Sequence, residues 1–136
     1  MYKIAVLDDD RLWCLAIERC LKNDFEVSTF RYADALLQEI IQDINRYDLI
    51  MVDLSLPSEY YKEIDGRKLI RYLRETLPEP PLLVLATAFI SKNDLASGQV
   101  ICPEVDAFLA KDAGLVEIQQ QIKQLLNNQK RRLPMF

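Results

Sequence analysis

Polar side chains that could carry out chemistry stand directly after four short apolar runs of the sequence. They are an acidic triplet, a lone aspartate, a threonine and a lysine: Asp8-Asp9-Asp10, Asp53, Thr87 and Lys111. If the apolar runs are parallel strands of one sheet, these side chains gather at one edge, because ligand sites lie beyond the carboxyl ends of such strands. A polar residue after one strand is ordinary, but polar residues of these types after four different strands indicate a site.

The residue types at this edge favour phosphoryl chemistry assisted by a metal ion. Asp8, Asp9 and Asp53 would repel one another at close range unless a cation offsets their charge. Carboxylates without imidazole or thiolate ligands suit a hard cation, and Mg²⁺ fits best because it accepts one or two carboxylates together with phosphate oxygens. Lys111 supplies a point charge and Thr87 a hydroxyl donor for the oxygens of a phosphoryl group. One carboxylate is then left to act as the nucleophile.

Two absences exclude other kinds of catalysis. The chain contains no histidine, which excludes Ser-His and Cys-His nucleophilic pairs, imidazole zinc sites and a histidine phosphorelay step within the chain. It contains only three glycines, so neither a Walker loop nor a dinucleotide-binding glycine motif can be written. Cys14, Cys20 and Cys102 have no C-x-x-C spacing, and we interpret them as free thiols that pack as small apolar groups.

The charge balance and the hydropathy pattern exclude two further classes of protein. Lys and Arg number 17 against 21 Asp and Glu, a net charge of −4, which disfavours a surface built to hold nucleic-acid phosphates. The longest apolar stretch, residues 81–90, is about half as long as a membrane helix, and no charged-then-apolar leader precedes it. We therefore expect no direct nucleic-acid binding, no membrane span and a cytoplasmic location.

The apolar pattern predicts strands and helices in alternation. Five short runs are expected to be strands, the second with the alternation of an edge strand: residues 4–7, 25–30, 49–52, 82–86 and 105–110. Apolar residues recur at the helical period in four other segments: 13–21, 36–44, 69–77 and 115–125. A further helix, the fourth in order and the least firmly held, is expected behind the capping box of Ser91 and Asp94.

Strict alternation of this kind predicts an α/β fold. The expected architecture is a five-stranded parallel sheet with helices on both faces and right-handed crossovers. The doubly wound, flavodoxin-like strand order 2-1-3-4-5 is the most economical one. Ligands bind to such a sheet near the point where strands one and three leave in opposite directions, so the residues that end the strands are the candidates for the site.

Four segments together resemble the signature of response-regulator receiver domains. In order and spacing they are Val6-Leu7-Asp8-Asp9-Asp10, Val52-Asp53-Leu54-Ser55-Leu56-Pro57, Leu85-Ala86-Thr87-Ala88 and Phe108-Leu109-Ala110-Lys111. The resemblance covers roughly residues 2–126. It implies a signalling domain of a two-component system, which takes a phosphoryl group from a sensor histidine kinase or a histidine phosphotransfer protein. Such a domain catalyses its own phosphotransfer and slow autodephosphorylation, and it controls a downstream effector domain or protein.

The resemblance also assigns roles around the acceptor. Asp53 is implied as the phosphoacceptor, and Asp9 and Asp53 as direct ligands of Mg²⁺ or Mn²⁺. The main-chain carbonyl of Ser55 completes this set, and Asp8 holds metal-bound water. Asp10 is then expected mainly to cap the first helix.

The remaining roles concern the phosphoryl group and the response to it. Thr87, Lys111 and the amide of Ala88 are implied to bind phosphoryl oxygens, and Thr87 and Phe108 to form a conformational switch. The resemblance leaves open a homodimer through the fourth helix, the fifth strand and the fifth helix.

The sequence departs from the family pattern in three places. Phe108 stands where many members carry tyrosine, so a switch there must work through burial of the ring. Asp112 follows the lysine where proline is common, which removes the usual reason for a cis peptide. The stretch of residues 58–64 is longer than in the common pattern and carries Tyr60 and Tyr61. It is either a tolerated surface insertion or a contact for a partner. A loop at this place could also shield the acyl phosphate from water.

Two other functions and one boundary remain open in the sequence. A haloacid-dehalogenase-type phosphatase would use the Asp-x-Asp within residues 8–10 but leaves Asp53 unexplained. A pseudo-receiver that only docks partners usually lacks one of the site residues, whereas this chain has them all. We expect a domain over residues 1–126 and a polar, basic tail or linker over residues 127–136, in which Pro134 ends the last helix.

Overall fold

A computed structural model of the chain describes residues 1–54, 66–88 and 102–132. Along the chain the described elements are β1 (Lys3–Leu7), α1 (Arg11–Leu21), β2 (Glu26–Phe30), α2 (Ala33–Gln42), β3 (Leu49–Asp53), α3 (Gly66–Thr76), β4 (Leu82–Thr87), β5 (Ala107–Ala110), the 3₁₀ turn η2 (Lys111–Ala113) and α5 (Leu115–Arg132). The helix predicted behind Ser91 lies outside the described residues. The alternation of strands and helices that the apolar pattern predicts is therefore confirmed for the part of the chain that is described.

The five strands form one parallel sheet in the order β2-β1-β3-β4-β5. This is the strand order predicted from the sequence. In the register of the sheet Asp53 pairs with Ala86, and Thr87 pairs with Ala110. The ends of the three strands β3, β4 and β5 are thus level with one another, which brings the residues that end them to one edge of the sheet.

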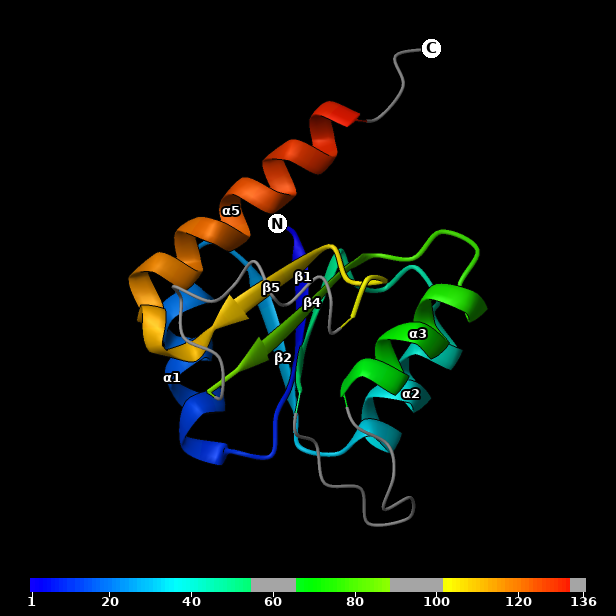
Figure 1. Cartoon of the computed structure of the whole chain (residues 1–136), viewed down its shortest axis with the longest axis horizontal. Coiled ribbons are helices and arrows are strands. Elements are labelled where there is room, and N and C mark those ends of the chain that lie inside the picture. The colour runs from blue at the N-terminus through cyan, green and yellow to red at the C-terminus, as the bar shows by residue number, and fades with distance from the viewer. Residues whose placement is uncertain (55–65, 89–101, 133–136) are drawn as a thin grey trace.

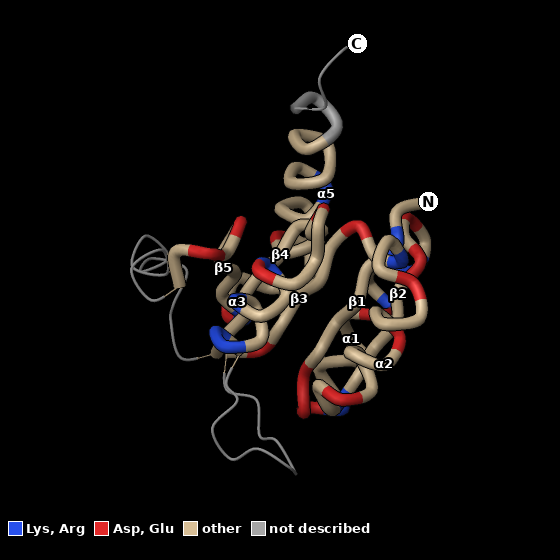
Figure 2. The backbone as a smooth tube through the Cα atoms, turned by 90° about the vertical axis from the view of Figure 1, so that its right-hand side faces the viewer, with Lys and Arg blue, Asp and Glu red and all other residues tan. Residues whose placement is uncertain are grey.

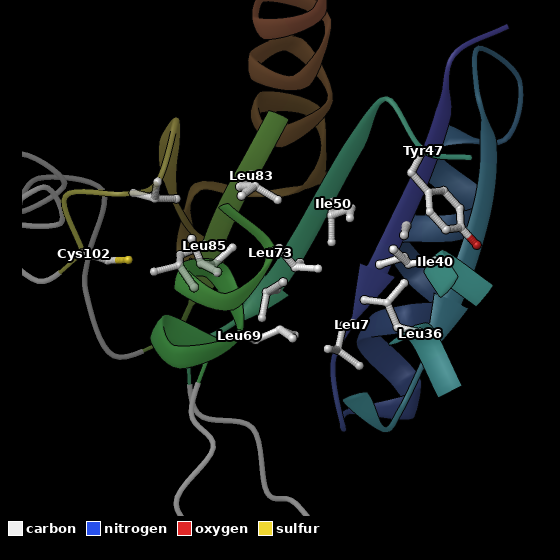
Figure 3. Close-up of a cluster of buried hydrophobic side chains, with 14 of the residues drawn as sticks. Leu7, Leu36, Ile40, Tyr47, Ile50, Leu69, Leu73, Leu83, Leu85 and Cys102 are labelled. Atoms are coloured by element: carbon white, nitrogen blue, oxygen red, sulfur yellow. The ribbon is translucent and has the colours of Figure 1, made fainter. Parts of the chain in front are cut away.

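Helices cover both faces of the sheet, α1 and α5 on one and α2 and α3 on the other (Figure 1). The strands β1, β3, β4 and β5 are largely buried, whereas the edge strand β2 is only half-buried. Alternate residues of a buried strand enter different cores. Ile4 and Val6 of β1 belong to the cluster beneath α1 and α5, whereas Ala5 and Leu7 belong to the cluster beneath α2 and α3 (Figure 3). None of the described helices combines the length and the apolar character needed to cross a membrane.

The fifth strand and the second helix differ from their predicted bounds. β5 begins at Ala107 rather than at residue 105, because the Val105 amide donates to the carbonyl of Cys102 and closes a turn (3.3 Å). α2 ends at Gln42 rather than near residue 44. The backbone of Asp43 is extended there, and the side chain of Asp43 accepts the amide of Asn45, which favours a turn over another helical residue.

The last helix extends further than its apolar pattern. Ile118, Ile122 and Leu126 face the core, and the helix then continues to Arg132, where its C-terminal part reaches beyond the sheet (Figure 1). Its described part ends at Arg132, and Pro134, which is predicted to end the helix, lies outside the described residues.

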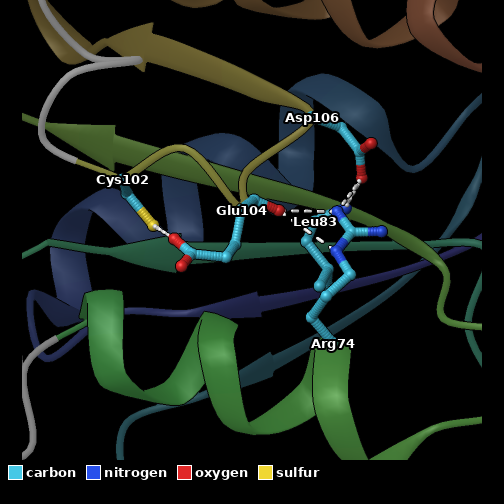
Figure 4. A network of polar contacts seen from close by, with 5 residues as sticks. All are labelled: Arg74, Leu83, Cys102, Glu104 and Asp106. Atoms are coloured by element: carbon cyan, nitrogen blue, oxygen red, sulfur yellow. Dashed lines mark hydrogen bonds and ion pairs between the residues drawn. The ribbon is translucent and has the colours of Figure 1, made fainter.

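A polar network joins α3 to the connection that enters β5 (Figure 4). The guanidinium of Arg74 donates to the carbonyl oxygen of Glu104 (2.7 and 3.1 Å) and to the carboxylate of Asp106 (2.8 Å). The same Asp106 oxygen accepts the amide of Leu83 in β4 (2.8 Å). Arg74 therefore satisfies the carbonyl of Glu104 and holds the carboxylate of Asp106, which in turn accepts a backbone amide of β4.

Candidate phosphoryl-transfer site

The acidic triplet lies immediately after β1, and its three members take different roles. The amide of Asp8 donates to the carbonyl of Phe30 at the end of β2 (3.0 Å), which anchors the start of the loop. The Asp8 side chain is almost fully buried, at 1% exposure, and accepts the amide of Asp10 (2.9 Å). Asp9 is exposed. The side chain of Asp10 accepts the amides of Leu12 and Trp13, so its predicted role as the cap of α1 is confirmed.

Asp53 and Thr87 end the two strands at the centre of the site. Asp53 is the last residue of β3 and is 8% exposed, and Thr87 is the last residue of β4 and is fully buried. The amide of Leu54 donates to the carbonyl of Ala86 (3.1 Å), so the parallel pairing continues past Asp53. The acceptor proposed from the sequence is therefore held by backbone on a rigid strand end, with its side chain largely removed from water.

The Lys111 side chain reaches back from the end of β5 to the carboxylates. Its ammonium nitrogen lies 2.5 Å from an oxygen of Asp8 and 3.8 Å from an oxygen of Asp53. The same nitrogen lies 4.6 Å from the centre of the Trp13 ring. The Lys111 side chain is 14% exposed, so this ion pair is largely shielded from solvent and is screened less than a surface pair.

Three carboxylates converge at this edge of the sheet. Asp8, Asp9 and Asp53 each offer an oxygen, and these oxygens all lie within 4.8 Å of one another. The acidic stretch at the end of β1 is visible as a red segment at the foot of that strand (Figure 2). Three carboxylates facing one ammonium leave a local excess of two negative charges, which matches a divalent cation. A donor set made only of carboxylate oxygens suits Mg²⁺ or Mn²⁺.

A buried thiol of α1 is hydrogen-bonded to the backbone of the acidic loop. The Cys14 thiol in α1 donates to the main-chain carbonyl of Asp8 (3.4 Å). Burial, and then the negative charge of Asp8, raise the pKa of Cys14 to about 11. The thiol is therefore neutral at physiological pH and packs as a small apolar group. Cys102 is also buried, and Cys20 partly so, and all three thiols are free, as the sequence predicts.

The other predicted site residues fall into two groups. Ala88 is exposed directly after β4, and Phe108 in β5 is buried, at 8% exposure, in the cluster beneath α2 and α3. Ser55, predicted as a metal ligand through its carbonyl, lies outside the described residues, as does the stretch 58–64 with its two tyrosines. The peptide after Lys111 is trans, in keeping with Asp112 at the position where proline is common.

Two residues of the site were not identified from the sequence. The helical period of residues 13–21 predicts only that Trp13 lies on an apolar helix face, whereas its ring also lies against the ammonium of Lys111. Gly66 begins α3, and its amide donates to the carbonyl of Leu54 (3.0 Å). A Cβ at Gly66 would collide with the carbonyl oxygen of Asp53. The only available signal in the sequence is the position of Gly66 just after the stretch 58–64, which does not reveal what the glycine approaches.

Comparison with known proteins agrees with this geometry. The family model for the response regulator receiver domain matches residues 4–123. The chain is 25% identical to the two-component response regulator ORR26 of Oryza sativa subsp. japonica and 28% identical to the two-component response regulator ARR11 of Arabidopsis thaliana. Each of these matches covers 83 residues, which is 60% of the chain. These matches span only 13% and 15% of those proteins. The crystal structure of a CheY-like response regulator receiver domain protein from Methanospirillum hungatei superposes with a TM-score of 0.76 at 20% identity, over 96% of this chain and 98% of that one.

Proposed function

Because the chain belongs to the response regulator receiver domain family, we propose that it accepts a phosphoryl group on Asp53 from a sensor histidine kinase or a histidine phosphotransfer protein. The observation that carries this proposal is the convergence of Asp8, Asp9 and Asp53 with the ammonium of Lys111 at one edge of the sheet. The two alternative readings of the sequence do not use this whole set. The phosphatase reading leaves Asp53 without a role, and a docking module needs none of these four charges.

Asp9 and Asp53 would bind the divalent cation, Mg²⁺ or Mn²⁺, directly, and Asp8 would hold it through a metal-bound water. By family resemblance the main-chain carbonyl of Ser55 would be a further ligand. Asp9 is the exposed member of the set, which leaves an open side for phosphoryl oxygens. A cation at this position supplies positive charge that stabilises the phosphoryl oxygens during transfer. The fit rests on the donor set, three carboxylates within reach of one another and without imidazole or thiolate.

In the proposed reaction a carboxylate oxygen of Asp53 attacks the phosphorus of the donor. A new O–P bond forms, the bond from phosphorus to the donor nitrogen or oxygen breaks, and the leaving group keeps that electron pair. Lys111, Thr87 and the amide of Ala88 bind the phosphoryl oxygens. The product is an acyl phosphate, and attack by water on its phosphorus regenerates the carboxylate. The domain thus modifies itself and is not an enzyme that turns over a separate substrate.

The proposed output is a change of conformation that an effector domain or protein detects. Thr87 moves toward the phosphoryl oxygens, and the ring of Phe108 fills the space that it leaves, which shifts a pre-existing equilibrium. Phe108 has no ring hydroxyl, so the inward position gains no hydrogen bond. Its ring is already only 8% exposed, so the gain in apolar burial is well below the roughly 1.5–3 kcal/mol of burying a fully exposed ring. A homodimer through the fourth helix, β5 and α5 is one such output. A location in the cytoplasm and an absence of direct nucleic-acid contacts are part of this proposal.

Intact mass spectrometry tests the proposed chemistry. After incubation with Mg²⁺ and a small acyl-phosphate donor, the wild-type protein should gain the mass of one phosphoryl group, and Asp53→Asn should gain none. Asp10→Asn is the matched control within the acidic loop, because asparagine also caps helices well and Asp10 is outside the proposed ligand set. An adduct that persists in Asp53→Asn, or that forms as fast when the metal is chelated, would overturn the proposal. A docking module without phosphoryl chemistry would show no adduct under any of these conditions.

A further inference from the structure

The ammonium of Lys111 has an uncharged partner besides the two carboxylates. It lies 4.6 Å from the centre of the Trp13 ring and contacts Asp8 and Asp53 through oxygens at 2.5 and 3.8 Å. The face of an indole attracts a cation through its quadrupole, most strongly where water is excluded. The Lys111 side chain is only 14% exposed. With so little water around the ammonium, the contact with Trp13 is strong enough to influence where the ammonium lies.

The Trp13 ring is held in place by features that do not depend on the charges of the site. Trp13 lies in the first turn of α1, and its amide is bound by the side chain of Asp10 (3.2 Å). Its side chain packs against the cluster beneath α1 and α5. Lysine, by contrast, carries its charge on a flexible four-carbon stem. A fixed ring beside a flexible cation can restrict where that cation lies.

We propose that Trp13 is a positioning residue of the phosphoryl-transfer site, which holds the Lys111 ammonium beside Asp53 while the charges around it change. This inference rests on the function proposed above. Asp8 and Asp53 both interact with Lys111. Asp53 is also a proposed ligand of the cation, and Asp8 is proposed to hold metal-bound water. Their hold on Lys111 weakens when they also serve a cation or a phosphoryl group. The indole carries no charge and ligates no metal, so its contact with Lys111 persists through these changes.

A double-mutant cycle on the folding equilibrium separates this contact from simple core packing. The proteins are wild type, Trp13→Leu, Lys111→Met and the double mutant, unfolded by urea without metal. Leucine fills apolar space but has no π face, and the loss of packing is the same in both backgrounds. We expect Trp13→Leu to lower the folding equilibrium constant more in the protein with Lys111 than in the Lys111→Met variant. The two effects should differ by a factor of about three to thirty. Equal effects in both backgrounds would overturn the inference.

The rate of phosphoryl transfer tests the positioning role itself. With Mg²⁺ and a small acyl-phosphate donor, Trp13→Leu should slow phosphorylation of Asp53 about fivefold to tenfold, and Trp13→Phe should restore part of the rate because phenylalanine keeps a weaker π face. Leu12→Ala is the matched control, since Leu12 is its exposed neighbour in α1. Unchanged rates in Trp13→Leu would remove the positioning role, since a residue that only packs the core does not affect the reacting groups.

Intrinsic fluorescence gives a readout that does not depend on activity. Trp13 is the only tryptophan of the chain, so its emission reports on the Lys111 ammonium directly. Lys111→Met should change the emission intensity of the metal-free protein, and an identical spectrum would contradict the contact. A wild-type protein that takes no phosphoryl group would remove the proposed function and the positioning role together. Additive mutations in a protein that is phosphorylated on Asp53 would remove the positioning role alone.

Discussion

Replacement of Gly66 by alanine should disturb the acceptor through its backbone. Gly66 is buried at the start of α3, and its amide binds the carbonyl of Leu54. A Cβ added there would overlap the carbonyl oxygen of Asp53 and would lie 3.0 Å from the carbonyl carbon of Asp53 and from the Cα of Leu54. The three nearest atoms all belong to the backbone of Asp53 and Leu54, so no flexible side chain can move away to make room.

The size of the effect follows from this overlap. Non-bonded carbon atoms pack best at about 3.5–4.0 Å, so the start of α3 and the end of β3 must separate by roughly 1 Å. Overpacking of this kind usually costs about 1–3 kcal/mol of folding free energy. A displacement of about 1 Å at a reacting group can slow a reaction by roughly a hundredfold. We therefore expect Gly66→Ala to lose about 1–3 kcal/mol of stability and at least about tenfold in the rate of Asp53 phosphorylation.

Urea unfolding and a phosphorylation time course measured by intact mass test this expectation. Ile40→Val on α2 is the stability control, because a buried isoleucine truncated to valine typically costs about 0.5–1.5 kcal/mol and Ile40 contributes no group to the site. The control should lose stability and keep its rate. If Gly66→Ala also kept the rate of the control at a similar stability, the close approach of α3 to Asp53 would not matter for the chemistry.

Three further predictions concern the supports of the site and of the fold. Asp10→Ala should lose about 1 kcal/mol of stability in urea unfolding, as expected for the loss of an N-cap. Its Mg²⁺ affinity, measured by calorimetry, should equal that of the wild type, and a large loss of affinity would make Asp10 a ligand. Burial raises the pKa of Cys14 from 9.0 to about 11, so its thiol favours the folded state below pH 9 and loses this contribution as the pH rises toward 11. The stability of the wild type should thus fall more steeply over this range than that of Cys14→Ala, and parallel curves would show that Cys14 does not titrate there. Arg74→Met should lose about 1–2 kcal/mol in urea unfolding because it removes charge-assisted hydrogen bonds. The control Arg71→Met removes a more exposed ion pair (48% exposure for Arg71) and should lose less than about 1 kcal/mol. Equal losses would contradict the role of the Arg74 network.

The strands and the outline of the site could be predicted because they depend on local patterns. A strand that is buried on both faces reads as a short apolar run, and crossovers of one hand fix where parallel strands lie relative to one another. Once the strand ends are known, Asp8, Asp53 and Lys111 must meet, whatever the details of the loops. The strand order and the acidic cluster followed from these two rules.

The supports of the site could not be predicted because they depend on contacts between distant parts of the chain. The helical period already accounted for Trp13 as a core residue, and nothing in the sequence indicates that one face of its ring meets Lys111. The close approach of Gly66 depends on the path between β3 and α3. Arg74 is charged and near the end of a helix, a pattern typical of a solvated residue, although it binds the connection before β5.

The most direct test of phosphorylation on Asp53 is the identity of the modified residue. After phosphorylation by a small acyl-phosphate donor with Mg²⁺, reduction with borohydride converts an aspartyl phosphate into homoserine, which peptide mass spectrometry locates. Phosphorylation of Asp53 predicts homoserine at position 53 and at no other aspartate of the chain. Homoserine at position 8 or 9, or a phosphoryl adduct that borohydride does not convert at position 53, would contradict it.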